Sequence, residues 1–76
     1  MVITVDFMGV LQDSHGKNRK FEVKDNLTVS EFLEKIYFKG EMIHSLLIIR
    51  DNTFINKYAI LKDGDKIRIA TVVGGG

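Results

Sequence analysis

The chain has no cysteine, no proline and no tryptophan among its 76 residues. Without cysteine it can form neither a disulfide nor a thiolate metal site, which excludes an iron–sulfur ferredoxin and two usual ways of stabilising a small protein. An excess of one charge is also lacking, because 11 basic and 10 acidic side chains leave a net charge of +1. Proteins that bind nucleic acid through its phosphates carry a basic excess, so the balance argues against a nucleic-acid partner.

Long apolar runs are missing as well. The longest one, Leu46 to Ile49, is far shorter than the roughly 20 residues that cross a bilayer. The first residues show neither the basic segment nor the apolar stretch of a secretory signal. The length allows one domain with a small core. We therefore expect a small, soluble, cytoplasmic domain with no membrane partner.

The first part of the chain has the alternating pattern of β-strands. Ile3, Val5 and Phe7 lie at every second position, which predicts a strand with one buried face. Polar, turn-forming residues from Gln12 to Asn18 predict a loop. Alternation returns at residues 20–24 and places Phe21 and Val23 inward, so the two strands are expected to form a hairpin.

The apolar period then changes to that of a helix, with Val29, Phe32, Leu33 and Ile36 on one stripe. Thr28 and Glu31 have the spacing of a capping box, in which each side chain accepts a hydrogen bond from the other residue's amide. Lys35 and Lys39 suit the C-terminal end of the helix dipole, and Gly40 suits a left-handed stop.

The remaining segments predict three further strands. Leu46 to Ile49 is expected to be a short buried strand, and the turn residues Asp51 and Asn52 lead to a brief strand at 53–55. A turn at 63–65 precedes a strand over 66–73, with Ile67 and Ile69 inward. One helix stripe can cover one apolar sheet face, which predicts a two-layer α+β domain with the first and last strands side by side in the centre.

Residues for conventional catalysis are few. His15 and His44 are far apart in sequence, and neither has the spacing of a metal ligand. Ser14 is adjacent to His15, but we interpret both as loop residues because a triad needs three groups held in place. Residues 63–65 are interpreted as a turn rather than a cation site. A basic cluster on the hairpin (Lys17, Arg19, Lys20 and Lys24) is interpreted as a solubilising strand edge.

Three glycines, Gly74, Gly75 and Gly76, follow the last predicted strand. Glycine loses the most conformational entropy on ordering and adds nothing to a core, so such a tail suggests a use for the end itself. A tail without side chains can enter a narrow cleft, and it extends about 10 Å at 3.3–3.6 Å per residue. Its carboxylate is ionised at neutral pH and could attack the α-phosphate of a nucleotide.

Several of these segments resemble the ubiquitin-like sulfur carriers, namely the thiamine sulfur carrier and the small subunit of molybdopterin synthase. The opening 5–11, the Gly16-Lys17 pair and the start of the helix at 28–33 look like the molybdopterin-synthase type. The Gly64-Asp65 turn, the following strand and the final Val73-Gly-Gly-Gly also fit, the last looking more like the thiamine type. Many molybdopterin-type members have prolines before the double glycine, where Thr71-Val72-Val73 stand here.

The resemblance implies a ubiquitin-like β-grasp fold, with a mixed sheet of four to five strands on one α-helix. It implies a domain over 1–73, a glycine tail over 74–76, and no catalytic residue in the chain. Gly76 would be adenylated by a ubiquitin-activating-type enzyme that uses ATP and magnesium, and a sulfur-donor enzyme would convert it to a thiocarboxylate. Gly74 and Gly75 would pass through the partner's channel. The acceptor would be thiazole synthase or the large subunit of molybdopterin synthase, or an enzyme of another sulfur transfer such as transfer-RNA thiolation; no cofactor would be permanently bound.

A partner surface is expected on the outward face of the last strand. Ala70 and Val72 share their parity with Lys66 and Arg68, and an exposed Met8 on the neighbouring strand could join them, as could Val2. Two other functions stay open. A protein modifier joined through Gly76 would use the same activated end. A small β-grasp domain that binds a ligand or RNA would not need the glycines.

Overall fold

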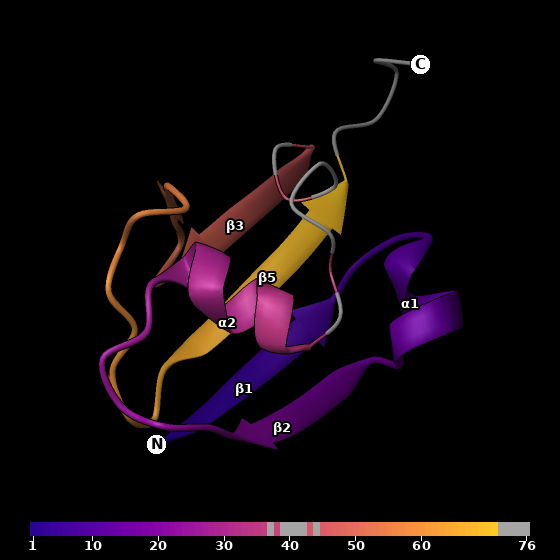
Figure 1. The fold of residues 1–76 in the computed structure, drawn as a ribbon. Helices are drawn as coiled ribbons and strands as arrows, with labels where there is room; N and C mark the ends of the chain where they lie inside the picture. Colours follow the sequence, from indigo (N-terminus) through magenta and orange to yellow (C-terminus); the bar gives the residue numbers. More distant parts are fainter. Residues whose placement is uncertain (37, 39–42, 44, 72–76) are drawn as a thin grey trace.

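The computed structural model describes residues 1–36, 38, 43 and 45–71. Within them the chain forms five strands and two helices, in the order strand, helix, strand, helix, and three strands (Figure 1). Their bounds are β1 Val2–Phe7, α1 Leu11–His15, β2 Asn18–Glu22, α2 Val29–Lys35, β3 Leu46–Arg50, β4 Thr53–Ile55 and β5 Lys66–Thr71. None of the helices in these ranges is long and apolar enough to span a membrane.

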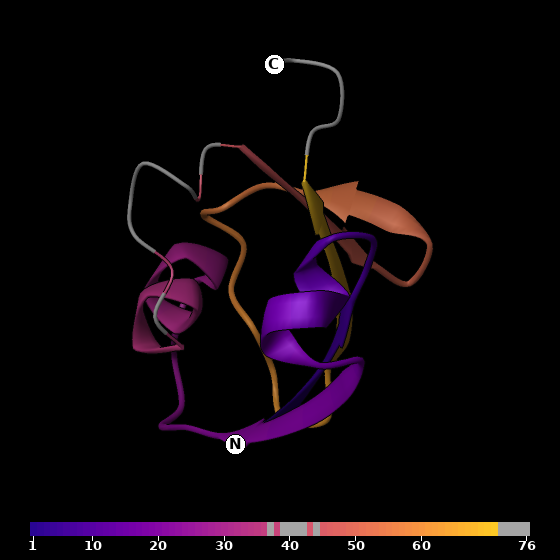
Figure 2. The ribbon, with the colours of Figure 1, turned by 90° about the vertical axis from the view of Figure 1, so that its right-hand side faces the viewer.

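The strands form one mixed sheet in the order β2-β1-β5-β3-β4. β1 and β5 lie side by side and parallel, with Val5 opposite Ile67, while the other neighbours are antiparallel. α2 crosses one face of this sheet, as the two perpendicular views show (Figures 1 and 2). The predicted two-layer α+β architecture, with the first and last strands adjacent inside the sheet, is therefore confirmed.

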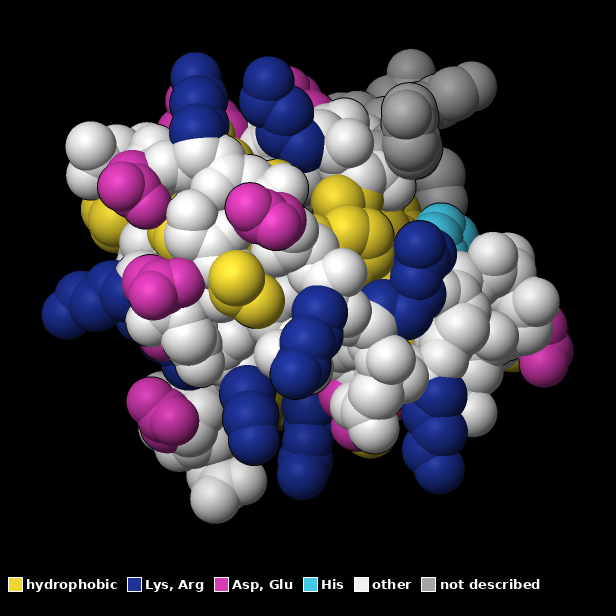
Figure 3. All heavy atoms as spheres, turned by 90° about the horizontal axis from the view of Figure 1, so that it is seen from below, with side chains coloured by type: hydrophobic (Ala, Val, Ile, Leu, Met, Phe, Trp, Pro, Cys, Tyr) yellow, Lys and Arg dark blue, Asp and Glu magenta, His cyan; other side chains and the backbone are white. Residues whose placement is uncertain are grey.

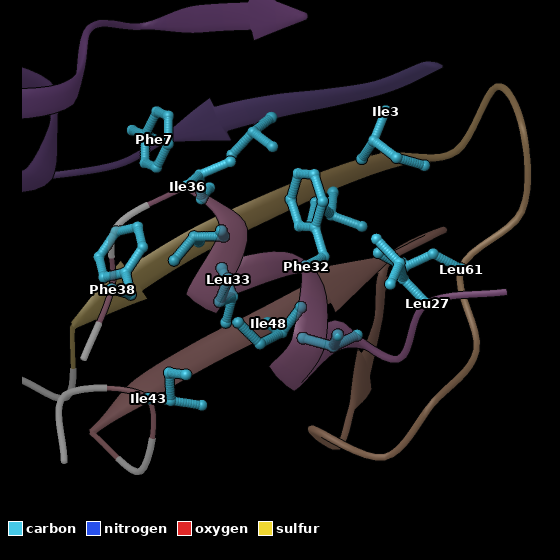
Figure 4. Close-up of a cluster of buried hydrophobic side chains, with 14 of the residues drawn as sticks. Ile3, Phe7, Leu27, Phe32, Leu33, Ile36, Phe38, Ile43, Ile48 and Leu61 are labelled. Carbon is cyan, nitrogen blue, oxygen red and sulfur yellow. The ribbon is translucent and has the colours of Figure 1, made fainter. Parts of the chain in front are cut away.

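The core lies between α2 and the sheet. Ile3, Val5 and Phe7 are fully buried, and so are the inward side chains of β5. The helix stripe predicted from the sequence meets them, with Phe32 and Leu33 fully buried (Figure 4). Phe21 and Val23 are partly buried against the same cluster, as expected for the inward face of the hairpin.

The start of α2 is built as the sequence predicts. The hydroxyl of Thr28 accepts a hydrogen bond from the amide of Glu31 at 3.1 Å, and the Glu31 carboxylate accepts one from the amide of Thr28 at 2.9 Å. The expected stop at Gly40 is wrong, because the helix ends at Lys35 and Ile36 is its C-cap. The amide of Ile36 bonds to carbonyls of the last turn, which closes the helix before it reaches that glycine. Lys39 and Gly40 lie outside the described residues.

The segment after β1 differs from the predicted loop, because Leu11–His15 forms a five-residue helix. Gly9 turns the chain out of β1 at φ +60°, and Leu11 is buried as the single apolar anchor of α1. One buried residue gives no helical period, which is why the pattern of the sequence indicated a polar loop.

The remaining turns fall where the sequence places them. Asp51 and Asn52 both have positive φ, the geometry of a two-residue hairpin between β3 and β4. Gly64 has φ +86° in the turn before β5. The prediction of a buried strand at 46–49 is only partly right, since Ile48 is buried but Leu47 is 39% exposed. β3 has only one face against the core, so its four apolar residues cannot all be buried.

The capping box makes a testable contribution to stability. Replacing Thr28 with Ala should lower the free energy of unfolding by about 1 kcal/mol, because the amide of Glu31 loses its acceptor. Urea denaturation at neutral pH measures the change. Ser30→Ala is the matched control within the same turn, and it should change the value by less than about 0.5 kcal/mol. Equal losses from both variants would contradict the prediction.

The same box predicts an acid dependence. The pKa of Glu31 lies below its ordinary value of 4.5, first because the backbone amide of Thr28 donates to the carboxylate, and further through the Thr28 side chain and the charges of Lys24 and Lys35. A lowered native pKa means that this stabilisation is present above the unfolded pKa and is lost as the pH falls through the native pKa. The stability difference between the wild type and Glu31→Gln should therefore be constant above about pH 5.5 and shrink towards pH 3. Denaturation curves across this range in which the difference does not change would refute the assignment.

Candidate functional site

The central strand β5 leads directly to the glycine tail. β5 lies between β1 and β3, and its last residue, Thr71, is opposite Leu46. The predicted tail residues Gly74, Gly75 and Gly76, together with Val72, lie outside the described residues. What the structure describes is therefore the base from which the tail begins and the surface around it.

Two hydrogen-bonded groups fix the start of β5. The Asp65 carboxylate accepts a hydrogen bond from Arg50 at 3.0 Å and one from the amide of Lys62 at 2.8 Å. The Asp63 carboxylate accepts one from the amide of Val2 at 2.7 Å, which ties the turn to β1. Both carboxylates are thus used in holding the turn. The interpretation of residues 63–65 as a turn is consistent with these bonds, and within the described residues no group of three potential metal ligands occurs.

The sheet face opposite α2 brings two of the predicted partner residues together. Ala70 is half-buried and opposite Leu47 on β3. Met8 comes directly after β1, and its amide donates to the carbonyl of Ile69 at 2.9 Å, which places it next to Ala70. Met8 is half-buried rather than exposed, so the sequence overstated its accessibility.

Three residues that the sequence analysis missed extend this surface. Leu47 and Ile49 alternate with the buried Ile48 on β3, and Phe54 on β4 lies opposite Ile49. Phe54 is 69% exposed although it is a large apolar side chain in a strand. The contact could have been predicted from the turn residues at 51–52, because a two-residue hairpin turn places Ile49 opposite Phe54. We call these side chains the outer patch: Met8, Leu47, Ile49, Phe54 and Ala70.

Charged residues border the outer patch. Arg68 is exposed and lies between Asp6 on β1 and Ile49 on β3. A shallow hollow of about 260 Å³ opens here, with Asp6, Ile49 and Arg68 among its lining residues. One carboxylate oxygen of Asp6 is buried and has no hydrogen-bond partner among the described residues. The surface therefore combines exposed apolar side chains with a polar margin, as protein interfaces do.

The Ser14 and His15 pair does not make a catalytic site. The Ser14 hydroxyl lies 2.9 Å from His15 Nδ1, closer than the loop interpretation implied. Within the part of the chain that the structure describes, no carboxylate bonds to the imidazole to orient it. The ring is instead stacked on Phe38 at 4.7 Å and on Phe7 at 5.1 Å between centroids. His15 thus packs as a flat side chain against the core. His44 lies outside the described residues.

One known protein family and several solved structures are similar to this chain. A sequence model of the ThiS family matches residues 5–76. No curated protein matches the chain. The crystal structure of SAMP1 from Haloferax volcanii is similar with a TM-score of 0.78, at 15% identity and with both chains covered over 100% of their length.

Two further solved structures have the same fold. A putative molybdopterin converting factor subunit 1 from Pyrococcus furiosus has a TM-score of 0.77 at 15% identity, over 96% of this chain and 99% of that one. A chain in the complex of subunits 1 and 2 of the molybdopterin-converting factor from Helicobacter pylori 26695 has a TM-score of 0.65 at 26% identity, with 100% of both chains covered. The expected ubiquitin-like β-grasp fold is confirmed.

Proposed function

The chain belongs to the ThiS family, and on that premise we propose that it is a sulfur carrier that acts through the carboxylate of Gly76. Membership confirms the resemblance to the ubiquitin-like sulfur carriers. The observation that carries the proposal is that the family match extends over residues 5–76 and so includes the whole glycine segment. The ubiquitin-like fold supports it, because β5, the strand that precedes that segment in the sequence, lies in the centre of the sheet.

The proposed chemistry takes place at the glycine carboxylate and in partner enzymes. A carboxylate oxygen attacks the α-phosphorus of ATP, with magnesium held by the activating enzyme, and pyrophosphate leaves. The terminal sulfur of a persulfide on the sulfur donor then displaces AMP from the acyl carbon, which gives an acyl disulfide. A second thiol of the partner enzymes attacks the donor's sulfur, so that a disulfide forms between the two partner thiols and the thiocarboxylate leaves on Gly76. In this proposal the chain supplies a substrate group and no catalyst.

The outer patch is the surface on which we propose that the activating enzyme docks. It lies beside the end of β5, so an enzyme seated there also faces the start of the tail. Leu47 and Phe54 are exposed and the other three members are half-buried, and Phe54 provides the flat, rigid side chain that often anchors interfaces. Val72 would extend the patch towards the tail by its parity with Ala70.

The acceptor of the sulfur is proposed to be an enzyme of the large-subunit type. The Helicobacter pylori structure is a complex of subunits 1 and 2 of the molybdopterin-converting factor, and its matching chain is similar to this one over its full length. This likeness supports an acceptor for molybdenum or tungsten cofactor synthesis, and thiazole synthase stays the alternative acceptor because the family match is to ThiS. We keep a protein modifier as the second function, because the small archaeal modifier protein 1 of H. volcanii has a similar fold, and the same activated end would serve a modifier.

The intact mass of the protein tests whether Gly76 carries the proposed thiocarboxylate. Protein isolated from its own cells without reducing or hydrolytic treatment should contain a species heavier by the difference between sulfur and oxygen, located by fragmentation to Gly76. A variant lacking Gly75 and Gly76 should contain none. Gly76 found in isopeptide linkage to lysines would show a modifier instead. Only carboxylate, with no adenylate formed by any activating enzyme of the host plus ATP, would overturn both functions.

Docking through the outer patch is tested with Ala70→Asp. The added carboxylate would enter an apolar contact without a partner, so the KM of the activating enzyme for the carrier should rise about tenfold. Asn56→Asp adds the same charge in the loop after β4 and keeps the oxygen that accepts from the amide of Tyr58. Adenylation kinetics should not change for this control. Unchanged kinetics for Ala70→Asp would remove the outer patch from the proposal.

A further inference from the structure

A second hollow, on the other side of the molecule from the outer patch, is not used by the proposed function. It has a volume of about 320 Å³ and lies between α1, β2 and the end of α2. Phe7, Phe21 and Ile36 form its apolar floor. Ser14, His15, Arg19 and Lys35 supply its polar groups. In the view of Figure 3, apolar side chains lie next to the histidine, with Lys or Arg side chains beside them.

The charged side chains that line this hollow are both basic. They are Arg19 and Lys35, and no carboxylate of the described residues lines it. Residues 16–24 carry four basic side chains and one acidic one, whereas the whole chain has a net charge of only +1. Of the basic cluster that the sequence indicated as a strand edge, Arg19 lines this concave site, whereas Lys20 pairs with Thr4 and belongs to the opposite face of the sheet. A concave surface lined by one sign of charge concentrates the opposite ion.

Arg19 is held in place rather than free in solvent. Its guanidinium lies 5.0 Å from the centroid of the Phe21 ring, and its Nη1 donates to the carbonyl of His15 at 3.2 Å. Gly16 leaves room for the methylene groups of Arg19, because a Cβ at position 16 would stand 3.1 Å from Arg19 Cδ. Among the described residues no carboxylate pairs with Arg19, so most of its five N–H donors are available. A positioned, unpaired guanidinium binds anions with little further loss of entropy.

The other polar groups are also oriented. His15 is fixed by its stacking on Phe7 and Phe38, and its Nδ1 is engaged with the Ser14 hydroxyl, which leaves Nε2 for a ligand. Lys35 stands in the last turn of α2 and forms no ion pair within the described ranges. A helix end by itself attracts cations, so Lys35 has one reason to be there without a ligand. The attraction of cations to the helix end does not account for Arg19, which is held in place on the opposite wall of the hollow.

We propose that this hollow binds a small organic anion, with a phosphate or carboxylate group between Arg19 and Lys35 and a flat apolar group against Phe21 and Ile36. The volume of about 320 Å³ is at the lower end of the range for small-molecule sites, which fits a ligand with one ring. The site lies apart from the outer patch, so occupancy does not depend on Gly76 or on the activating enzyme.

Phenyl phosphate is the probe for this site. Titration followed by amide chemical shifts should move the signals of Ser14, Arg19, Phe21 and Lys35 and give one dissociation constant. Inorganic phosphate and phenol each lack one half of the recognised group, so both should bind more weakly. Arg19→Gln should weaken phenyl phosphate about tenfold, the factor expected when one charge-assisted hydrogen bond is lost. Lys35→Gln should weaken it in the same direction and gives a second, independent variant.

Lys62→Gln is the matched control, because it removes the same charge from an exposed side chain near the start of β5, at the opposite end of the sheet from α1. It should leave the dissociation constant unchanged. Equal weakening by Lys62→Gln and Arg19→Gln would show attraction to overall charge and overturn the proposal. So would shifts spread over the surface, or phosphate and phenyl phosphate binding equally well. Each variant is first shown to keep the wild-type dispersion of amide signals, so that a loss of binding is not a loss of fold.

Discussion

The parallel pairing of β1 with β5 is the interaction on which the rest of the structure depends. It joins the two ends of the sequence in the middle of the sheet and brings Ile3, Val5 and Phe7 next to Ile67 and Ile69 under α2. Without it the hairpin β1–β2 would be separated from the strands β5, β3 and β4, and a two-stranded ribbon is barely stable alone. The carboxylates of Asp63 and Asp65 hold the turn that aligns β5, so polar bonds set the register and apolar burial stabilises it.

Much of this fold follows from the sequence, because period and capping are local. The alternation of Ile3, Val5 and Phe7 and the spacing of Thr28 and Glu31 each specify an element without reference to the rest of the chain. The adjacency of the first and last strands, β1 and β5, was predicted from their long alternating patterns. The end of α2 at Lys35 does not follow, since a helix end is decided by the bonds that Ile36 makes and not by the nearest glycine.

The candidate site was less predictable from the sequence, because its residues come together through contacts between different strands and helices. Ala70 and Met8 could be placed on the outward face by parity alone, but Leu47 and Phe54 join them only through pairing between strands. A run of four apolar residues on β3 looked buried because the sequence does not show which face lacks a covering layer. The hollow beside α1 needed still more, since Gly16, Arg19 and Lys35 come together only when the helix, the hairpin and their turns are all in place.

The position of β5 has a consequence for how the protein is made. Because the strand at the centre of the sheet is the last one in the sequence, a growing chain on the ribosome cannot complete its core until residues 66–71 have left the exit tunnel. Closing so long a loop before any central contact forms is slow, and it leaves the edges of both hairpins unpaired meanwhile. The absence of proline removes the slow isomerisation of X–Pro bonds as a further delay. Folding and the presentation of the glycine segment then occur together, and an unfinished chain offers no outer patch for an enzyme to engage.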